Sequence, residues 1–131
     1  MTLYLGLFRG DEEVCGWVLG RYGDFAFFRD VVREHFALEE LPLLLGCSDC
    51  DAAFAGPELA ALRTELSLVA ARFKRARPIT PAKAFAHNNG QWSQAASLYD
   101  CFRNVDDENL VDAMLELCDR GASEKLTLLF Q

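Results

Sequence analysis

Cys47 and Cys50 form a C-x-x-C pair, and Asp49 and Asp51 flank the second cysteine. Thiolates and carboxylates are ligands for zinc, and paired thiols also carry redox chemistry. A structural zinc site needs four ligands. The residues that could supply the two further ligands are isolated in the sequence: His35, His87, Cys101 and Cys118. A redox pair of the thioredoxin type lies at the start of a helix, whereas six residues separate Cys50 from Pro57, where the next helix is predicted.

The carboxylates beside this pair also oppose thiol chemistry, because negative charge from Asp49 and Asp51 raises the pKa of a neighbouring thiol. We therefore interpret Cys47 and Cys50 as ordinary thiols of a loop and expect neither a metal nor another cofactor. A small cytoplasmic protein that binds a metal or uses thiol chemistry through Cys47 and Cys50 is the alternative.

The histidines give no catalytic pattern. His87 is followed by Asn88 and Asn89, but the spacing assigns neither a nucleophile nor a group that orients it. His35 lies beside an apolar stripe and has no second metal-type residue one helical turn away. We expect both to be solvated or half-buried residues, and we expect that the protein is not an enzyme.

Length and composition are those of one globular domain over residues 1–131, with 51% hydrophobic and 25% charged residues. No apolar run approaches the about 20 residues that a bilayer span requires. No secretion signal is recognisable at the start. The five cysteines, an odd number, fit a reducing compartment better than a disulfide framework. We therefore expect a cytoplasmic protein without a membrane partner.

The net charge of −7 is unevenly distributed. The basic cluster Arg72, Lys74, Arg75 and Arg77 falls at the predicted end of a helix, where the helix dipole favours cations. A nucleic-acid-binding protein needs a continuous basic face, so we expect no nucleic-acid partner. The chain is acidic both before and after this basic cluster. These acidic segments form a solubilising surface or a surface that attracts a basic protein.

The helix predicted over residues 57–77 organises the rest of the chain. An apolar stripe runs along it, and Pro57 suits the first helical position while Pro78 stops the helix. The stripe has helical spacing: Leu59, Leu62, Leu66, Val69 and Phe73. Since only one side is apolar, the other elements must cover that side.

The other elements follow from apolar periodicity and from turn and cap signals. Alternation predicts strands, and Gly16 inside the second of them suggests a bulge or a close approach. The strands are predicted over residues 2–8, 13–19, 43–46, 97–103 and 126–130. Helices are predicted over 24–36 and from an N-cap at Asp106 to Gly121, with a helical turn over 81–87.

This order of elements predicts an α+β fold. Two strands precede the first helix, so the sheet must be at least partly antiparallel. We expect a mostly antiparallel sheet of about five strands with about three main helices packed on one face.

Five segments together resemble a family of bacterial immunity proteins, the family numbered seventy among those of polymorphic toxin systems. The segments are TLYLGLF, RYGDFAFFRDVV, LLLGCSDCD, SLYDCF and LTLLFQ, and they extend over nearly the whole chain. The resemblance implies a small cytoplasmic protein that binds a cognate toxin domain and neutralises it. It supplies no catalytic residues.

If the protein blocks a toxin, its carboxylates would face a basic cleft, because charge complementarity speeds association and fixes register. The predicted contact residues are acids on loops and at helix starts, with two aromatic anchors. They are Asp11, Glu12, Glu13, Asp49, Asp51, Asp106, Asp107 and Glu108, with Trp92 and Tyr99. For each acid taken singly, a solvated surface charge or a helix-dipole partner is the alternative interpretation.

Overall fold

The computed structural model describes residues 2–79 and 95–131. Its N-terminal hairpin forms as the sequence predicts. β1 (Thr2–Arg9) pairs with β2 (Glu12–Arg21) in antiparallel register. Leu3, Leu5 and Leu7 of β1 are fully buried, whereas Tyr4 and Phe8, which point to the other face, are half-buried. One face of the hairpin therefore belongs to the core.

The described residues form one antiparallel sheet of four strands in the order β2-β1-β4-β3. β4 (Thr127–Phe130) lies between β1 and β3 (Ala53–Phe54), so the apolar C-terminal strand is an interior strand of the sheet. The prediction of about five strands is slightly too high. Two of the predicted strands do not form, and the two-residue β3 was not predicted.

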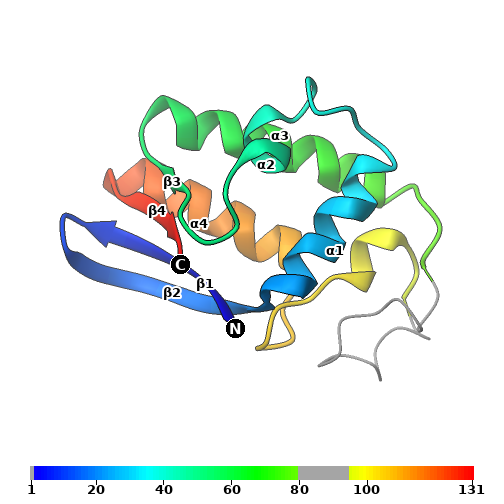
Figure 1. The fold of residues 1–131 in the computed structure, drawn as a ribbon, viewed down its shortest axis with the longest axis horizontal. Coiled ribbons are helices and arrows are strands. Elements are labelled where there is room, and N and C mark those ends of the chain that lie inside the picture. Colours follow the sequence, from blue (N-terminus) through cyan, green and yellow to red (C-terminus); the bar gives the residue numbers. More distant parts are fainter. Residues whose placement is uncertain (1, 80–94) are drawn as a thin grey trace.

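Three main helices pack against one face of this sheet: α1 (Tyr22–Arg33), α3 (Pro57–Phe73) and α4 (Leu110–Glu124). Figure 1 shows them together on one side of the strands, and α4 contacts both central strands, β1 and β4. The α+β class is therefore confirmed. No helix within the described residues is both long and apolar enough to cross a bilayer.

The predicted stripe of α3 is buried along its whole length, from Leu59 to Phe73. Its far end meets a cluster of aromatic rings centred on Phe28 of α1. The ring of Phe28 lies 6.2 Å from that of Phe73 and 5.1 Å from that of Phe102, measured between ring centroids. These rings join α1, α3 and the segment before α4 into one core.

Gly16 is a place of close approach, as the sequence suggested. A Cβ atom at this position would lie 2.5 Å from the hydroxyl oxygen of Tyr4 and 2.6 Å from the carbonyl oxygen of Leu5. Only glycine lets the ring of Tyr4 lie across β2 here. The hydroxyl of Tyr4 then donates a hydrogen bond of 2.8 Å to Glu13.

The strand predicted over residues 43–46 is wrong, because this segment is a short helix, α2 (Pro42–Gly46). Pro42 occupies its first turn, and the carboxylate of Glu65 on α3 accepts hydrogen bonds from the backbone N–H groups of Leu43 and Leu44. A short apolar run fits a buried strand or a buried helix equally well. Here the hydrogen bonds to Glu65, which is distant in sequence, favour the helix.

The strand predicted over residues 97–103 is also wrong. Its centre is a 3-10 helix, η3 (Leu98–Cys101). Leu98, Tyr99 and Cys101 are all buried although alternation would place them on opposite faces. A hydrogen bond from the N–H of Asp100 to the carbonyl of Ser97 holds this turn. The segment therefore forms a tight turn, although its alternating pattern predicts a strand.

α4 begins and ends later than predicted. Asn109, not Asp106, is its N-cap, and the Asn109 side chain accepts a hydrogen bond from the N–H of Asp112. Gly121 lies within the helix, and a Cβ at this position would meet Leu59 of α3 at 2.6 Å. The chain leaves the helix at Lys125, which has the left-handed conformation.

The remaining bounds differ by a few residues. α1 starts two residues before the predicted 24 and stops three before 36, and α3 ends at Phe73, although the prediction extended it to 77. The helical turn predicted over residues 81–87 lies outside the described residues.

Candidate functional site

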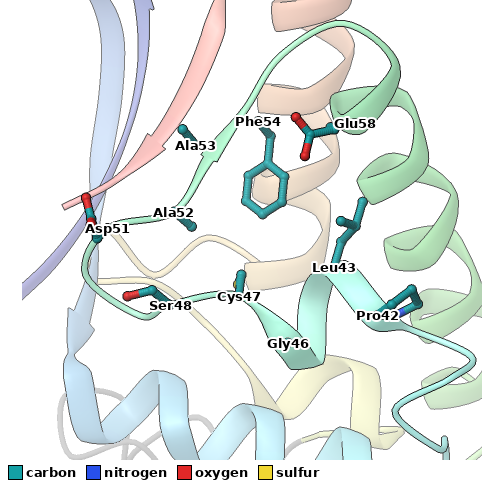
Figure 2. A pocket seen from close by; sticks show the side chains of 10 residues that line it. All are labelled: Pro42, Leu43, Gly46, Cys47, Ser48, Asp51, Ala52, Ala53, Phe54 and Glu58. Atoms are coloured by element: carbon teal, nitrogen blue, oxygen red, sulfur yellow. The ribbon is translucent and has the colours of Figure 1, made fainter.

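The loop that carries Cys47 and Cys50 borders a pocket of about 230 Å³ between α2, β3 and the first turn of α3. Figure 2 shows that it is framed by apolar side chains and backbone, with carboxylates at its margins. Its lining residues are Pro42, Leu43, Gly46, Cys47, Ser48, Asp51, Ala52, Ala53, Phe54 and Glu58. It is the natural place to look for the chemistry that the C-x-x-C pair suggested.

Cys47 is half-buried, and its thiol donates a weak hydrogen bond to the carbonyl of Leu44 at 3.7 Å. The guanidinium of Arg29 donates to the backbone carbonyl of Cys47 at 2.7 Å. Burial raises the pKa of the Cys47 thiol above its ordinary value even though Arg29 opposes this shift. A reactive cysteine needs the opposite shift, because the thiolate is the nucleophile.

Cys50 differs from Cys47 because it is exposed. Its sulfur lies 3.6 Å from the hydroxyl oxygen of Ser48, and its N–H donates to the same oxygen. All five cysteines are free. Within residues 2–79 and 95–131, no three or more His, Cys, Asp or Glu side chains are placed to hold a metal ion.

Alkylation of the native protein should label Cys50 well before Cys47. We expect iodoacetamide to modify Cys47 at least about tenfold more slowly near neutral pH, because its raised pKa and its burial both reduce the accessible thiolate. Peptide mass spectrometry over a time course measures both rates, and Cys50→Ser shows whether Cys47 reacts independently. Equal rates would mean that Cys47 is activated and would favour the thiol alternative.

The buried carboxylate of Glu65 holds the first turn of α2, which borders this pocket. Its two oxygens accept hydrogen bonds of 3.2 Å from the N–H of Leu43 and 2.8 Å from the N–H of Leu44. These N–H groups belong to the first turn of α2, where a helix has no internal acceptors. Glu65 therefore fixes one wall of the pocket.

Replacing Glu65 with alanine should lower the free energy of unfolding by about 1 to 3 kcal/mol, because two N–H groups lose their acceptor. Chemical denaturation measures the change. Glu116→Ala, at an exposed position on α4, is the matched control and should change stability by less than about 0.5 kcal/mol. Equal effects of the two substitutions would show that Glu65 has no structural role at α2.

The predicted acidic contact residues do not form one site. Figure 1 shows the hairpin turn, the loop before β3 and the loop before α4 as three separate parts of the molecule. Asp11 and Glu12 lie where β2 begins, at one edge of the sheet. Asp49 and Asp51 lie just before β3, at the opposite edge.

Three of the predicted acids help to hold the fold. Glu13 accepts the hydrogen bond from Tyr4. Asp107, in the left-handed conformation, lies 3.8 Å from the guanidinium of Arg103, and Glu108 accepts from the side chain of Asn104. These acids therefore have structural partners in the free protein.

The other five predicted acids have no hydrogen-bond or ion-pair partner among the described residues, and all of them are exposed except Asp49, which is half-buried. They are Asp11, Glu12, Asp49, Asp51 and Asp106. Their charges are available to a partner because they stabilise no contact within the described part of the chain.

Tyr99 is not available as a surface anchor, which corrects the interpretation of this residue. Its side chain is buried with 5% exposure, and its hydroxyl donates to Asp112 on α4. Burial, together with this hydrogen bond, raises the pKa of Tyr99 well above its ordinary value. Trp92, the other predicted anchor, lies outside the described residues.

A second hollow, which the sequence did not single out, lies between β2 and α4. Its volume is about 180 Å³. It is lined by Cys15, Gly16, Trp17, Ala113, Glu116, Leu117 and Arg120. The one feature of the sequence that could have indicated this hollow is the tryptophan inside a predicted strand. This residue, Trp17, is half-buried.

Comparison of the chain with models of protein families, with curated proteins and with solved structures finds no match in any of the three.

Proposed function

We propose that this protein is an immunity protein that binds a cognate bacterial toxin domain in the cytoplasm and neutralises it by covering its surface. The observation that carries the proposal is the set of exposed carboxylates without partners among the described residues, on a chain with a net charge of −7. The resemblance of five segments to a family of immunity proteins points in the same direction. The protein acts in this proposal as a binding module and catalyses no reaction.

Unpaired carboxylates suit such a role for a physical reason. A toxin that acts on a phosphate-containing substrate has a basic cleft, and an acidic protein is drawn to such a cleft by long-range attraction. Charge complementarity of this kind accelerates association to about 10⁸ M⁻¹s⁻¹ at low salt and disfavours wrong partners. Fast capture is what a cell needs from an inhibitor of its own toxin.

Co-purification tests the proposal. The gene immediately upstream is expected to encode a large protein with a variable C-terminal toxin domain. That domain, co-expressed with the tagged chain, should elute with it as one complex in size-exclusion chromatography. A C-terminal toxin domain from an unrelated locus is the control and should elute alone. Separate elution of the two cognate proteins would contradict the proposal.

A further inference from the structure

β2 is an edge strand whose outer side is largely open. β1 pairs with its inner side, and β2 stands last in the sheet. Over residues 12–18, one backbone hydrogen bond comes from outside the sheet within the described part of the chain. It runs from the N–H of Val105 to the carbonyl of Val18, at 3.3 Å. The edge thus already accepts one backbone hydrogen bond from a neighbouring segment. The backbone donors and acceptors along the rest of the edge are available to an added strand.

The regular part of this edge is short. The register between β1 and β2 shifts on either side of residues 15–18, so that Val14 and Leu19 are extra residues on β2. Bulges of this kind bend an edge strand and prevent long ladders between chains. An added strand therefore has room for only a few residues around Gly16.

The hollow between β2 and α4 lies directly beside this short edge. Trp17 and Cys15 come from the strand, and Leu117 and Ala113 from the helix. A volume of about 180 Å³ accommodates one apolar side chain. Half-buried tryptophan is a frequent energetic centre of protein interfaces. Alternate side chains of a strand added at Gly16 would point toward the side of the sheet on which this hollow lies.

Negative charge lies at both ends of this edge. Asp11 and Glu12 lie where β2 starts, and Asp106 follows Val105, which contacts Val18. Glu116 lines the hollow from α4. The cation in the hollow, Arg120, is paired with Glu124 at 2.7 Å. A fitting occupant has one apolar side chain with basic residues on both sides.

We propose that the open edge of β2 receives a short extended segment of the partner protein as an added strand, with an apolar side chain in the β2–α4 hollow and basic side chains toward Asp11, Glu12 and Asp106. This assignment rests on the proposed function, because the partner is the toxin domain. It selects the β2 edge over the β3 edge, where Asp49 and Asp51 lie.

Thiol footprinting of the complex tests this assignment, since each edge carries its own cysteine. Cys15 lines the hollow beside β2, and the exposed Cys50 precedes β3. In the purified complex with the toxin domain of the upstream gene, alkylation of Cys15 by iodoacetamide should slow at least about tenfold relative to the free chain. The alkylation rate of Cys50 should stay the same.

Two outcomes of the footprint overturn the assignment while leaving the proposed function intact. One is a stable complex in which Cys15 reacts as fast as in the free chain. The other is a complex in which Cys50 alone is protected, since the toxin would then cover the opposite edge. Failure to form any complex overturns the proposed function itself, and this assignment with it.

A pair of charge reversals gives an independent readout that does not depend on thiol reactivity. Glu116→Arg places a cation beside the hollow, and Glu58→Arg makes the same change of charge at the pocket on the other side. The first should weaken binding of the toxin domain at least about tenfold, and the second less than about twofold. Equal weakening by the two variants would contradict binding at β2.

Discussion

Truncation of Phe28 to alanine lowers the free energy of unfolding by about 3 to 5 kcal/mol, the range observed for large aromatic side chains in cores. Phe28 is fully buried and its ring contacts those of Phe25, Phe73 and Phe102. Removing it leaves a cavity where α1, α3 and the segment after η3 meet. This loss is a large fraction of the total free energy of unfolding of a domain of this size.

Urea denaturation followed by circular dichroism measures this loss. Leu68→Ala is the matched control, because Leu68 is an apolar residue of α3 with 48% exposure. It should change stability by less than about 0.5 kcal/mol. If Phe28→Ala costs less than about 1 kcal/mol, the aromatic cluster is not the centre of the core and the packing of α1 described above is wrong.

Neutralising Glu12 and Asp106 together slows association with the toxin domain at least about tenfold at low salt. Both acids are exposed and lie on either side of the β2 edge, so they act on a partner that approaches this edge. The effect should shrink as salt is added, since ions screen exposed charges over about 10 Å at 0.1 M. Stopped-flow or surface-plasmon measurements of the association rate test it.

The double variant Asp49→Asn with Asp51→Asn is the matched control. Each pair of substitutions removes two negative charges, so each changes the net charge from −7 to −5. We expect the control pair to slow association less than about threefold. Equal slowing by both pairs would show that total charge alone attracts the toxin, and it would remove the argument for a local acidic edge.

Elements with long, one-sided patterns could be predicted from the sequence. The stripe from Leu59 to Phe73 defines α3 by itself, because five apolar residues at helical spacing leave no other regular structure. The alternation in β1 is equally clear. The terminal strand β4 could be predicted from its apolar run, and the structure places it in the interior of the sheet.

Short segments could not be predicted because distant partners decide their structure. Residues 43–46 become helical through the carboxylate of Glu65, about twenty positions further on. The segment around Tyr99 turns tightly because its side chain reaches Asp112 and its carbonyl accepts from Asn109. Neither contact leaves a trace in the local pattern.

The candidate site was predictable only in part. That most of the loop acids are exposed follows from the sequence, since carboxylates are seldom buried without a partner. Their division between two edges of the sheet does not, because strand order is a property of the whole fold. The hollow beside Trp17 depends on α4, about a hundred residues further along the chain, and could not be inferred.

Growth of bacteria that express the upstream toxin domain is the most direct test of the central claim, which is neutralisation by binding. Cells that carry the toxin domain alone should stop growing, and co-expression of this chain should restore growth to the rate of cells without the toxin. A toxin domain from an unrelated locus should remain toxic in its presence. Arrest that is unchanged by the chain, at levels where both proteins are made, would contradict the account.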